Sequence, residues 1–240
     1  MPSFTTRSYQ AELLDDKEVP FEDIRRNMEE LDTINTWLGG HAITIAGLKK
    51  ILQRGNLLQP QNRLSTITIC EIGCGGGNNL IAIDKWLKKK KLKASYIGID
   101  INPHCLAHAK ATAGLAHAQW ITADYKEVQF DDQPHIIFSS LFCHHFKDDE
   151  LVTMLQWMEQ NTSLGFFIND LQRNPIAYHS IRLLTRLFSR SYLVKNDAPL
   201  SVLRGFSSKE LKGLMQRAGL LHCSIEWKWA FRWLLTNVKM

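Results

Sequence analysis

A carboxylate followed by closely spaced glycines is the part of this sequence best suited to hold a ligand. Glu71 precedes four glycines within residues 73–77. The residues before it, 66–70, are mostly apolar or β-branched, and apolar side chains recur at helical spacing over residues 80–87. The pattern therefore predicts a strand, a glycine loop and a helix. Such a loop admits unusual backbone dihedrals and lets a nucleotide approach the backbone.

The spacing of these glycines separates two kinds of nucleotide. A dinucleotide fingerprint requires a third glycine at the sixth position, where this chain has Asn78. The Gly-Lys-Ser/Thr of a P-loop is also missing from the segment. The carboxylate of Glu71 would repel an anionic pyrophosphate and would attract a cationic ligand.

Two further carboxylates follow segments that read as strands. Asp100 ends the apolar run 96–99, and Asp124 ends a similar run at residues 120–123. Because parallel strands present their carboxyl ends at one edge of a sheet, these side chains are expected near the glycine loop. Asp100 can accept hydrogen bonds from both hydroxyls of a ribose, and Asp124 can accept one from an adenine amino group.

The ordered set of Glu71, the glycines, Asp100 and Asp124 resembles the class I S-adenosylmethionine-dependent methyltransferases. The resemblance extends from about residue 66 to 146 and less clearly to the C-terminus. It implies an α/β fold, a Rossmann-like seven-stranded sheet with helices on both faces and a closing antiparallel hairpin. It also implies S-adenosylmethionine as the cofactor and S-adenosylhomocysteine as the product.

The resemblance assigns roles to particular residues. Glu71 orients the loop and the methionine amino group, Gly73 and Gly75 pass under the ligand, and Asp100 binds the ribose. Ile101 packs on the adenine, and Asp124 binds the adenine amino group. The other implied cofactor contacts are Cys74, Asn79, Tyr125 and Leu141.

Two adjacent histidines are the candidate catalytic residues. His144 and His145 follow a predicted strand at residues 134–140 and reach the ligand-binding edge of the sheet. A histidine titrates near neutral pH and can act as a general base, with His145 slightly favoured. Many relatives carry a His-Leu or His-Phe pair here that shapes the site without a proven base role. No metal site is expected, since neighbouring side chains point apart and no third ligand is suitably spaced.

Segments outside the glycine motif are expected to cover the site. Residues 1–62 are predicted to form a lid, and residues 63–240 a methyltransferase core. The lid contains helices at 21–38 and 42–52, broken by the glycine pair at 39–40. Residues 7–16 could also close over the site. Candidates to line the methionine end are Asn35, Trp37, Gly39 and Gly40.

A cap is predicted between the fifth strand and the last helix, at residues 171–206. It is read as a helix over 176–192 followed by an irregular link over 195–206, and it would cover the substrate. Its candidate substrate contacts are Arg173, Tyr178, His179 and Arg204. The chain is expected to close with a capping box at Ser207 and strands at 220–227 and 228–235. Alternation places Trp227, Trp229, Phe231 and Trp233 on one strand face.

Composition limits the class of protein and its partners. The 240 residues are 45% hydrophobic and 22% charged, which predicts a globular protein. A net charge of +5 is too weak to indicate nucleic acid. The five cysteines are read as reduced thiols of a cytoplasmic protein. No signal peptide or membrane span is expected, and the predicted state is monomer or homodimer.

These observations together predict O-methylation of a small phenolic or apolar hydroxylated acceptor. The lid and cap resemble methyltransferases of bacterial polyketide and pigment pathways and, more distantly, of quinone pathways, which indicates secondary metabolism. One alternative is C-methylation in quinone-type biosynthesis. An NAD-dependent oxidoreductase or a non-catalytic cofactor-binding protein also stays open. N-methylation is disfavoured because residues 141–144 depart from the Asn/Asp-Pro-Pro-Tyr motif.

Overall fold

A seven-stranded sheet forms the centre of the computed structural model, which describes residues 2–15, 18–115 and 117–239. The strand order is β3-β2-β1-β4-β5-β7-β6. Among these strands, β7 runs in the opposite direction to the other six and pairs antiparallel with both β5 and β6. The predicted sheet and closing hairpin are confirmed. The strands are β1 (Ile67–Ile72), β2 (Ala94–Asp100), β3 (Ala118–Thr122), β4 (Ile136–Ser140), β5 (Gly165–Leu171), β6 (Ser224–Lys228) and β7 (Arg232–Val238).

Helices cover both faces of the sheet and bury two separate apolar layers. On one face α2 (Gly40–Arg54) and α3 (Asn78–Lys89) pack on the sheet around the stacked rings of Phe138 and Phe167. On the other face α5 (Asp148–Asn161) and α8 (Ser208–Arg217) form the second layer. A further helix, α4 (Pro103–Thr112), contacts β2 and β3.

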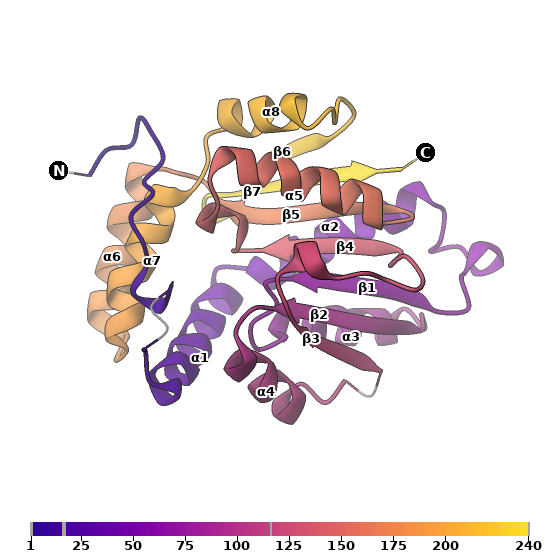
Figure 1. Ribbon diagram of the computed structural model, residues 1–240, viewed down its shortest axis with the longest axis horizontal. Coiled ribbons are helices and arrows are strands. Elements are labelled where there is room, and N and C mark those ends of the chain that lie inside the picture. Colours follow the sequence, from indigo (N-terminus) through magenta and orange to yellow (C-terminus); the bar gives the residue numbers. More distant parts are fainter. Residues whose placement is uncertain (1, 16–17, 116, 240) are drawn as a thin grey trace.

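Three helices lie beyond the carboxyl ends of the parallel strands, on the left in Figure 1. They are α1 (Phe21–Trp37), α6 (Pro175–Phe188) and α7 (Tyr192–Arg204). The N-terminal residues run alongside α7, with Ser8 N donating to Leu203 O at 3.0 Å. Short 3₁₀ turns complete the fold: η1 (Leu13–Asp15), η2 (Pro60–Asn62), η3 (Tyr125–Glu127) and η4 (Cys143–His145).

The segment expected to be an irregular link is helical, so that prediction was wrong. Residues 192–204 form α7 although Pro199 lies inside it. Proline in a helix interior costs about 3 kcal/mol relative to alanine. Ser191 caps the helix, and Leu193, Val194 and Leu200 are buried, so packing outweighs that cost.

The closing hairpin turns later than expected, which breaks up the predicted aromatic face. β6 ends at Lys228 and β7 begins at Arg232, so the turn contains Trp229 and Phe231. Trp227 and Trp233 lie opposite each other on the two strands, and Trp229 is 69% exposed. Period-two alternation does not continue through a turn, so these four aromatic side chains do not share one strand face.

Two further local predictions, the helix break at the glycine pair and the capping box at Ser207, are confirmed. Gly39, with φ +76°, separates α1 from α2, although α2 begins at Gly40 instead of residue 42. Ser207 and Glu210 form the capping box of α8. The five cysteines are free. Within the described residues, no helix combines the length and the apolar character needed to span a membrane.

Candidate functional site

The glycine loop has the backbone geometry that its sequence predicts. Gly73, Gly75 and Gly77 all have positive φ, at 67°, 50° and 75°. A Cβ at Gly73 would lie 2.4 Å from the ring of Phe142, and one at Gly77 would lie 2.5 Å from Trp120. At Gly75 a Cβ would meet no described atom within 4 Å. The side chains of Phe142 and Trp120 therefore pack against the two ends of the loop, and its middle glycine is open.

Glu71 supplies a buried acceptor beneath this loop. Its Oε1 accepts a hydrogen bond from Asn79 Nδ2 at 2.8 Å, whereas its buried Oε2 has no partner among the described residues. Burial raises the pKa of Glu71 well above its ordinary value. A cationic ligand group beside Oε2 would offset that penalty, so the site fits a positively charged nucleoside.

Asp100 ties the glycine loop to the end of β2. Its Oδ2 accepts from Gly75 N at 2.8 Å, and its Oδ1 accepts from Asn102 N at 2.9 Å. Each carboxylate oxygen keeps a second lone pair for a ligand hydroxyl. Ile101 follows and is 71% exposed, which leaves an apolar side chain at this edge of the sheet.

The other predicted cofactor residues lie at the same edge of the sheet or in the loop. Asp124 accepts from Lys126 N at 3.0 Å and caps η3, and the hydroxyl of Tyr125 is buried without a hydrogen-bond partner in the described chain. Cys74 is a buried thiol within the glycine loop. Leu141 has φ +54° at the end of β4, and its N–H donates to Asn169 O.

An elongated cavity of about 350 Å³ opens between this edge and the helices beyond it. Its walls are mainly apolar side chains of α1, α6 and α7. Its apolar lining includes Leu31, Ile34, Leu38, Leu141, Leu171, Ile181, Leu184 and Val202. Its polar lining includes Glu12, Asn35, His144, His145, Ser201 and Arg232. The cavity suits an acceptor with an apolar body and few polar groups.

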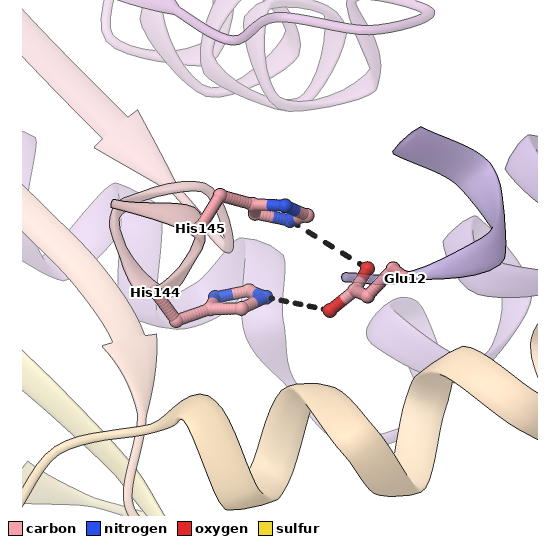
Figure 2. A group of neighbouring side chains, drawn as sticks. All are labelled: Glu12, His144 and His145. Atoms are coloured by element: carbon pink, nitrogen blue, oxygen red, sulfur yellow. Dashed lines mark ion pairs between the residues drawn. The ribbon is translucent and has the colours of Figure 1, made fainter. Parts of the chain in front are cut away.

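The two histidines and Glu12 face one another in this cavity (Figure 2). The imidazole centroids of His144 and His145 are 4.5 Å apart, with 36° between the ring planes. Each Nε2 atom lies 3.7 Å from an oxygen of the Glu12 carboxylate. The expectation that the neighbouring histidines point apart without a third group was wrong, because the η4 turn brings their rings together and a distant segment supplies Glu12.

Each histidine has a second carboxylate at its other nitrogen. His144 Nδ1 lies 2.7 Å from Asp170 Oδ1, and both side chains are buried. His145 Nδ1 lies 3.4 Å from Asp15 Oδ1. A carboxylate at Nδ1 favours the tautomer with its proton there, which leaves Nε2 as the acceptor atom. Both Nε2 atoms are therefore oriented to take a proton on the side that faces Glu12.

These contacts shift the carboxylate pKa values in opposite directions. Burial alone would raise the pKa of Asp170, but the charge and hydrogen bond of His144 lower it. Burial would likewise raise the pKa of Asp15, but the hydrogen bond and charge of His145 lower it to about 2. Burial raises the pKa of Glu12. The outer carboxylates therefore stay ionised, whereas Glu12 is the carboxyl that protonates most readily.

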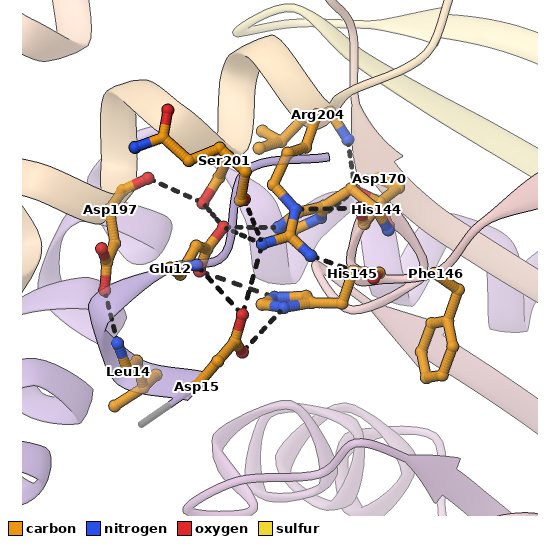
Figure 3. A network of polar contacts seen from close by, with 12 residues as sticks. Glu12, Leu14, Asp15, His144, His145, Phe146, Asp170, Asp197, Ser201 and Arg204 are labelled. Atoms are coloured by element: carbon orange, nitrogen blue, oxygen red, sulfur yellow. Dashed lines mark hydrogen bonds and ion pairs between the residues drawn. The ribbon is translucent and has the colours of Figure 1, made fainter. Parts of the chain in front are cut away.

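Glu12 is a functional candidate that the sequence did not identify. It belongs to an N-terminal segment without helical or strand periodicity, and no spacing connects it with the histidines. In the fold its carboxylate accepts a hydrogen bond from Ser201 Oγ at 2.6 Å. The amides of Leu13 and Leu14 donate to Asp197 at 2.9 and 3.0 Å, which holds the turn beside Glu12 (Figure 3).

Two buried arginines fasten the same region. Arg7 Nε donates to Arg204 O at 3.0 Å, and its Nη2 donates to Phe146 O at 2.9 Å. Arg204 donates to the carbonyls of His144 and His145 at 3.2 and 2.9 Å (Figure 3). The predicted closure by residues 7–16 is therefore formed by residues 7–15, and Asp16 lies outside the described residues.

The predicted substrate residues have other partners. Arg173 donates to Phe4 O and Gly205 O and pairs with Glu210, so it anchors the N-terminal segment. Tyr178 and His179 pack against Phe4. Like Arg204, they are not part of the cavity lining. The two arginines are buried against backbone carbonyls, Tyr178 is half-buried and His179 is exposed, so their placement does not support a substrate contact.

The predicted lining of the methionine end is divided by the fold. Asn35 is buried and lines the cavity, whereas Trp37 is 85% exposed on the outer side of α1. Gly40 lies beneath Asn35, since a Cβ there would be 1.7 Å from Asn35 Oδ1. Only one side of a helix can face the cavity, which separates Asn35 from Trp37.

The three facing groups could also hold a divalent cation. One potential ligand atom each from Glu12, His144 and His145 lies within 4.8 Å of the others, and carboxylates orient both histidines as at metal sites. Arg204 Nη1, however, lies 3.8 Å from Glu12 Oε1 and competes with a cation for that oxygen. The arrangement is therefore better suited to moving a proton.

Comparisons with known proteins place this geometry in a wider context. Residues 69–165 match the family model described as "Methyltransferase domain". A search of curated proteins found no match. Among solved structures, a SAM-dependent methyltransferase from Aquifex aeolicus is 14% identical with a TM-score of 0.59, and the match covers 93% of this chain and all of that one.

Two further solved structures show the same fold. The plantazolicin methyltransferase BpumL, in complex with a pentazolic desmethylPZN analog and SAH, has 18% identity and a TM-score of 0.60 over 85% of this chain and 72% of its own. Magnesium protoporphyrin IX methyltransferase from Synechocystis PCC 6803, with bound SAH, has 15% identity and a TM-score of 0.50, covering 94% and 90%. At these identities the likeness establishes the fold, and the domain model matches residues 69–165 of this chain.

Proposed function

We propose that this chain is a class I S-adenosylmethionine-dependent methyltransferase and that it transfers the methyl group to a hydroxyl of a small, largely apolar acceptor. The observation that carries the proposal is the cavity in which His144, His145 and Glu12 meet beside the carboxyl end of β4. Cytoplasmic location and a role in secondary metabolism stay predictions.

The cofactor side of the proposal depends on residues of the glycine loop and its edge. Glu71 would take the cationic amino group, and Asp100 would bind the ribose hydroxyls. The open face above Gly75 and the exposed Ile101 leave space and apolar surface for the nucleoside. S-adenosylmethionine supplies an already activated methyl group, so the protein must mainly align the acceptor and remove its proton.

The acceptor side depends on the facing side chains. A neutral hydroxyl is a poor nucleophile, and a base with a pKa near the working pH improves it. His145 is the proposed base because it lines the cavity and is more exposed than His144. Glu12 lies opposite both Nε2 atoms and stabilises an imidazolium formed at either of them.

We also propose that residues 1–62 act as a lid and residues 171–206 as a cap. The support is that α1, α6, α7 and η1 all contribute residues to one cavity. The plantazolicin methyltransferase, a structural neighbour, was crystallised with a pentazolic desmethylPZN analog and SAH, so this fold can hold a second molecule together with SAH.

Methyl transfer with labelled cofactor tests the function. The enzyme would be incubated with [methyl-¹³C]S-adenosylmethionine and a panel of phenols, aliphatic alcohols and hydroxylated quinones. We expect a methyl ether, identified by mass and by the ¹³C shift of an O-methyl carbon. A C-methyl product would favour quinone-type C-methylation instead, and cofactor binding without any product would favour the non-catalytic alternative.

Replacing Glu71 by glutamine should stabilise the free protein and weaken cofactor binding. The pKa of Glu71 is higher in the folded protein than in the unfolded chain. Below pH 4.5, its ordinary pKa, the carboxyl is protonated in both states and its contribution to stability is fully present. That contribution is lost as the pH rises towards the pKa of the folded state. At pH 7.5 the variant without ligand should melt about 2–4 °C higher, the shift that roughly 1 kcal/mol produces in a chain of this size. Thermal melts with and without S-adenosylhomocysteine measure both effects. A lower melting temperature together with an unchanged ligand-induced shift would contradict the assignment, and Glu127→Gln on the surface is the control.

Replacing Asp197 by alanine should release the turn that presents Glu12. The amides of Leu13 and Leu14 lose charged acceptors, each worth about 1.5–3 kcal/mol. We expect kcat to fall about tenfold while the affinity for S-adenosylhomocysteine stays within about twofold, since the loss of orientation affects the acceptor side. Lys195→Ala, which changes an exposed side chain of the same helix, is the matched control. Equal kcat values in both variants would show that the turn does not orient Glu12.

A further inference from the structure

Arg232 is a buried cation that the proposed reaction does not use. It begins β7, lines the cavity and is 3% exposed. Its Nε and Nη1 atoms are buried and have no hydrogen-bond partner in the described part of the chain. Burial lowers the pKa of Arg232 to about 10, although the negative charge of Asp170 acts in the opposite direction and raises it. An uncompensated guanidinium inside a protein is expensive, so a missing anionic partner is indicated.

The two carboxylates that contact His144, those of Asp170 and Glu12, are engaged elsewhere. Asp170 contacts His144 Nδ1 at 2.7 Å and accepts from Leu171 N at 2.7 Å. Glu12 accepts from Ser201 and faces the histidines. Neither carboxylate forms a hydrogen bond or ion pair with Arg232 among the contacts of the described residues. The fold therefore leaves the guanidinium for a ligand.

A second polar side chain lies beside Arg232. Asn35 is buried, lines the same cavity, and its Oδ1 has no hydrogen-bond partner within the described residues. Both side chains pack on Gly40, where a Cβ would lie 1.7 Å from Asn35 Oδ1 and 3.0 Å from Arg232 Nη1. Any larger residue at position 40 would displace this pair. The glycine therefore permits a two-residue polar corner in an otherwise apolar cavity.

We propose that Arg232 binds a carboxylate carried by the methyl acceptor and that the amide group of Asn35 lies beside this contact. A guanidinium presents parallel N–H donors that match the two oxygens of a carboxylate. The cavity that Arg232 lines is formed by the N-terminal segment, α1, α6, α7, the β6–β7 turn and the residues that end or follow β4 and β5, and its lining includes none of residues 73–77. This position favours the acceptor over the methionine carboxylate of the cofactor as the source of the anion.

The inference deepens the proposed function and rests on it. The acceptor is then a hydroxy acid, with its hydroxyl towards His145, its carboxylate at Arg232 and its apolar body against side chains such as Ile181 and Leu184. Opposite ends of one molecule would be held by different residues. Such two-point binding restricts the acceptor's rotation and presents its hydroxyl in one orientation.

Calorimetry in the presence of S-adenosylhomocysteine tests the anion site without requiring turnover. The probes are salicylate, 4-hydroxybenzoate and 4-hydroxycinnamate, each paired with its neutral primary amide. We expect the wild-type protein to bind at least one acid about 10–100-fold more tightly than its amide, the range for a charge-assisted contact. Arg232→Met should remove this preference, Arg232→Lys should keep part of it, and the surface variant Arg186→Met should keep all of it.

Two further measurements separate this inference from its alternatives. The unliganded Arg232→Met protein should melt at or above the wild-type temperature, because the variant removes an unpaired buried charge. If Arg232→Met weakens binding of S-adenosylhomocysteine but not of 5′-methylthioadenosine, the anion is the cofactor carboxylate and the proposal is overturned. It is also overturned if no acid binds the wild-type protein more tightly than its amide. Failure of the proposed O-methylation would appear differently, as retained acid preference without methyl ether formation.

Discussion

The Asp100→Ala variant is expected to lose about 100-fold or more in affinity for S-adenosylhomocysteine. The carboxylate is proposed to accept two ribose hydroxyls, and each charged hydrogen bond contributes about 1.5–3 kcal/mol. The same side chain also accepts from Gly75 N and Asn102 N, so the variant loosens the glycine loop as well. Isothermal titration with S-adenosylhomocysteine measures the loss directly.

Two variants divide the Asp100 effect into its parts. Asp100→Asn keeps an oxygen that can hold the loop but removes the charge, so it should fall between the wild type and Asp100→Ala. Asp132→Ala changes an exposed acid away from the loop and should leave the affinity unchanged. Wild-type affinity in Asp100→Ala would mean that the ribose is bound elsewhere. Tight binding of NADH instead of S-adenosylhomocysteine by the wild-type protein would overturn the cofactor assignment.

The His145→Ala variant is expected to lower kcat by about 10²–10⁴-fold, the range for loss of a general base. Its affinity for S-adenosylhomocysteine should stay near the wild-type value, because the imidazole faces Glu12 and the cavity. The loss should be largest for weakly acidic phenols and small for a nitrophenol, which is already ionised at neutral pH. Single-turnover methyl transfer across a phenol series measures this dependence.

Variants of the partner residues show whether His145 acts alone. Glu12→Gln preserves shape but cannot stabilise an imidazolium by its charge, so it should reduce kcat in the same direction with a smaller effect. His144→Ala tests the more buried histidine held by Asp170. An equal loss for all phenols in His145→Ala would show that the residue shapes the site without accepting the proton. Loss of cofactor affinity instead of kcat would make it a cofactor contact.

The glycine loop and the carboxylates near it could be predicted from the sequence because the residue patterns that define them are local. A strand, a glycine loop and a helix lie next to one another in the chain, and left-handed backbone at Gly73, Gly75 and Gly77 requires the residue type found there. Asp100 and Asp124 were expected at one edge because parallel strands align their carboxyl ends. Capping residues such as Ser207 likewise act within a few positions of their partners.

The acceptor side was decided by tertiary structure. Glu12 reaches His144 and His145 only because Asp197 and Arg7 hold an aperiodic N-terminal segment across α7. Arg173 and Arg204 bind backbone carbonyls in the fold, and no sequence pattern distinguishes such arginines from those that bind a substrate.

The sequence by itself determined the fold class, the glycine-loop motif and the sheet edge at which its carboxylates gather, because each depends on neighbouring residues or on strand order. Only the tertiary structure brings Glu12, the two histidines and Arg232 into one cavity. Contacts between distant segments depend on packing, and packing is not encoded in the spacing of any single segment.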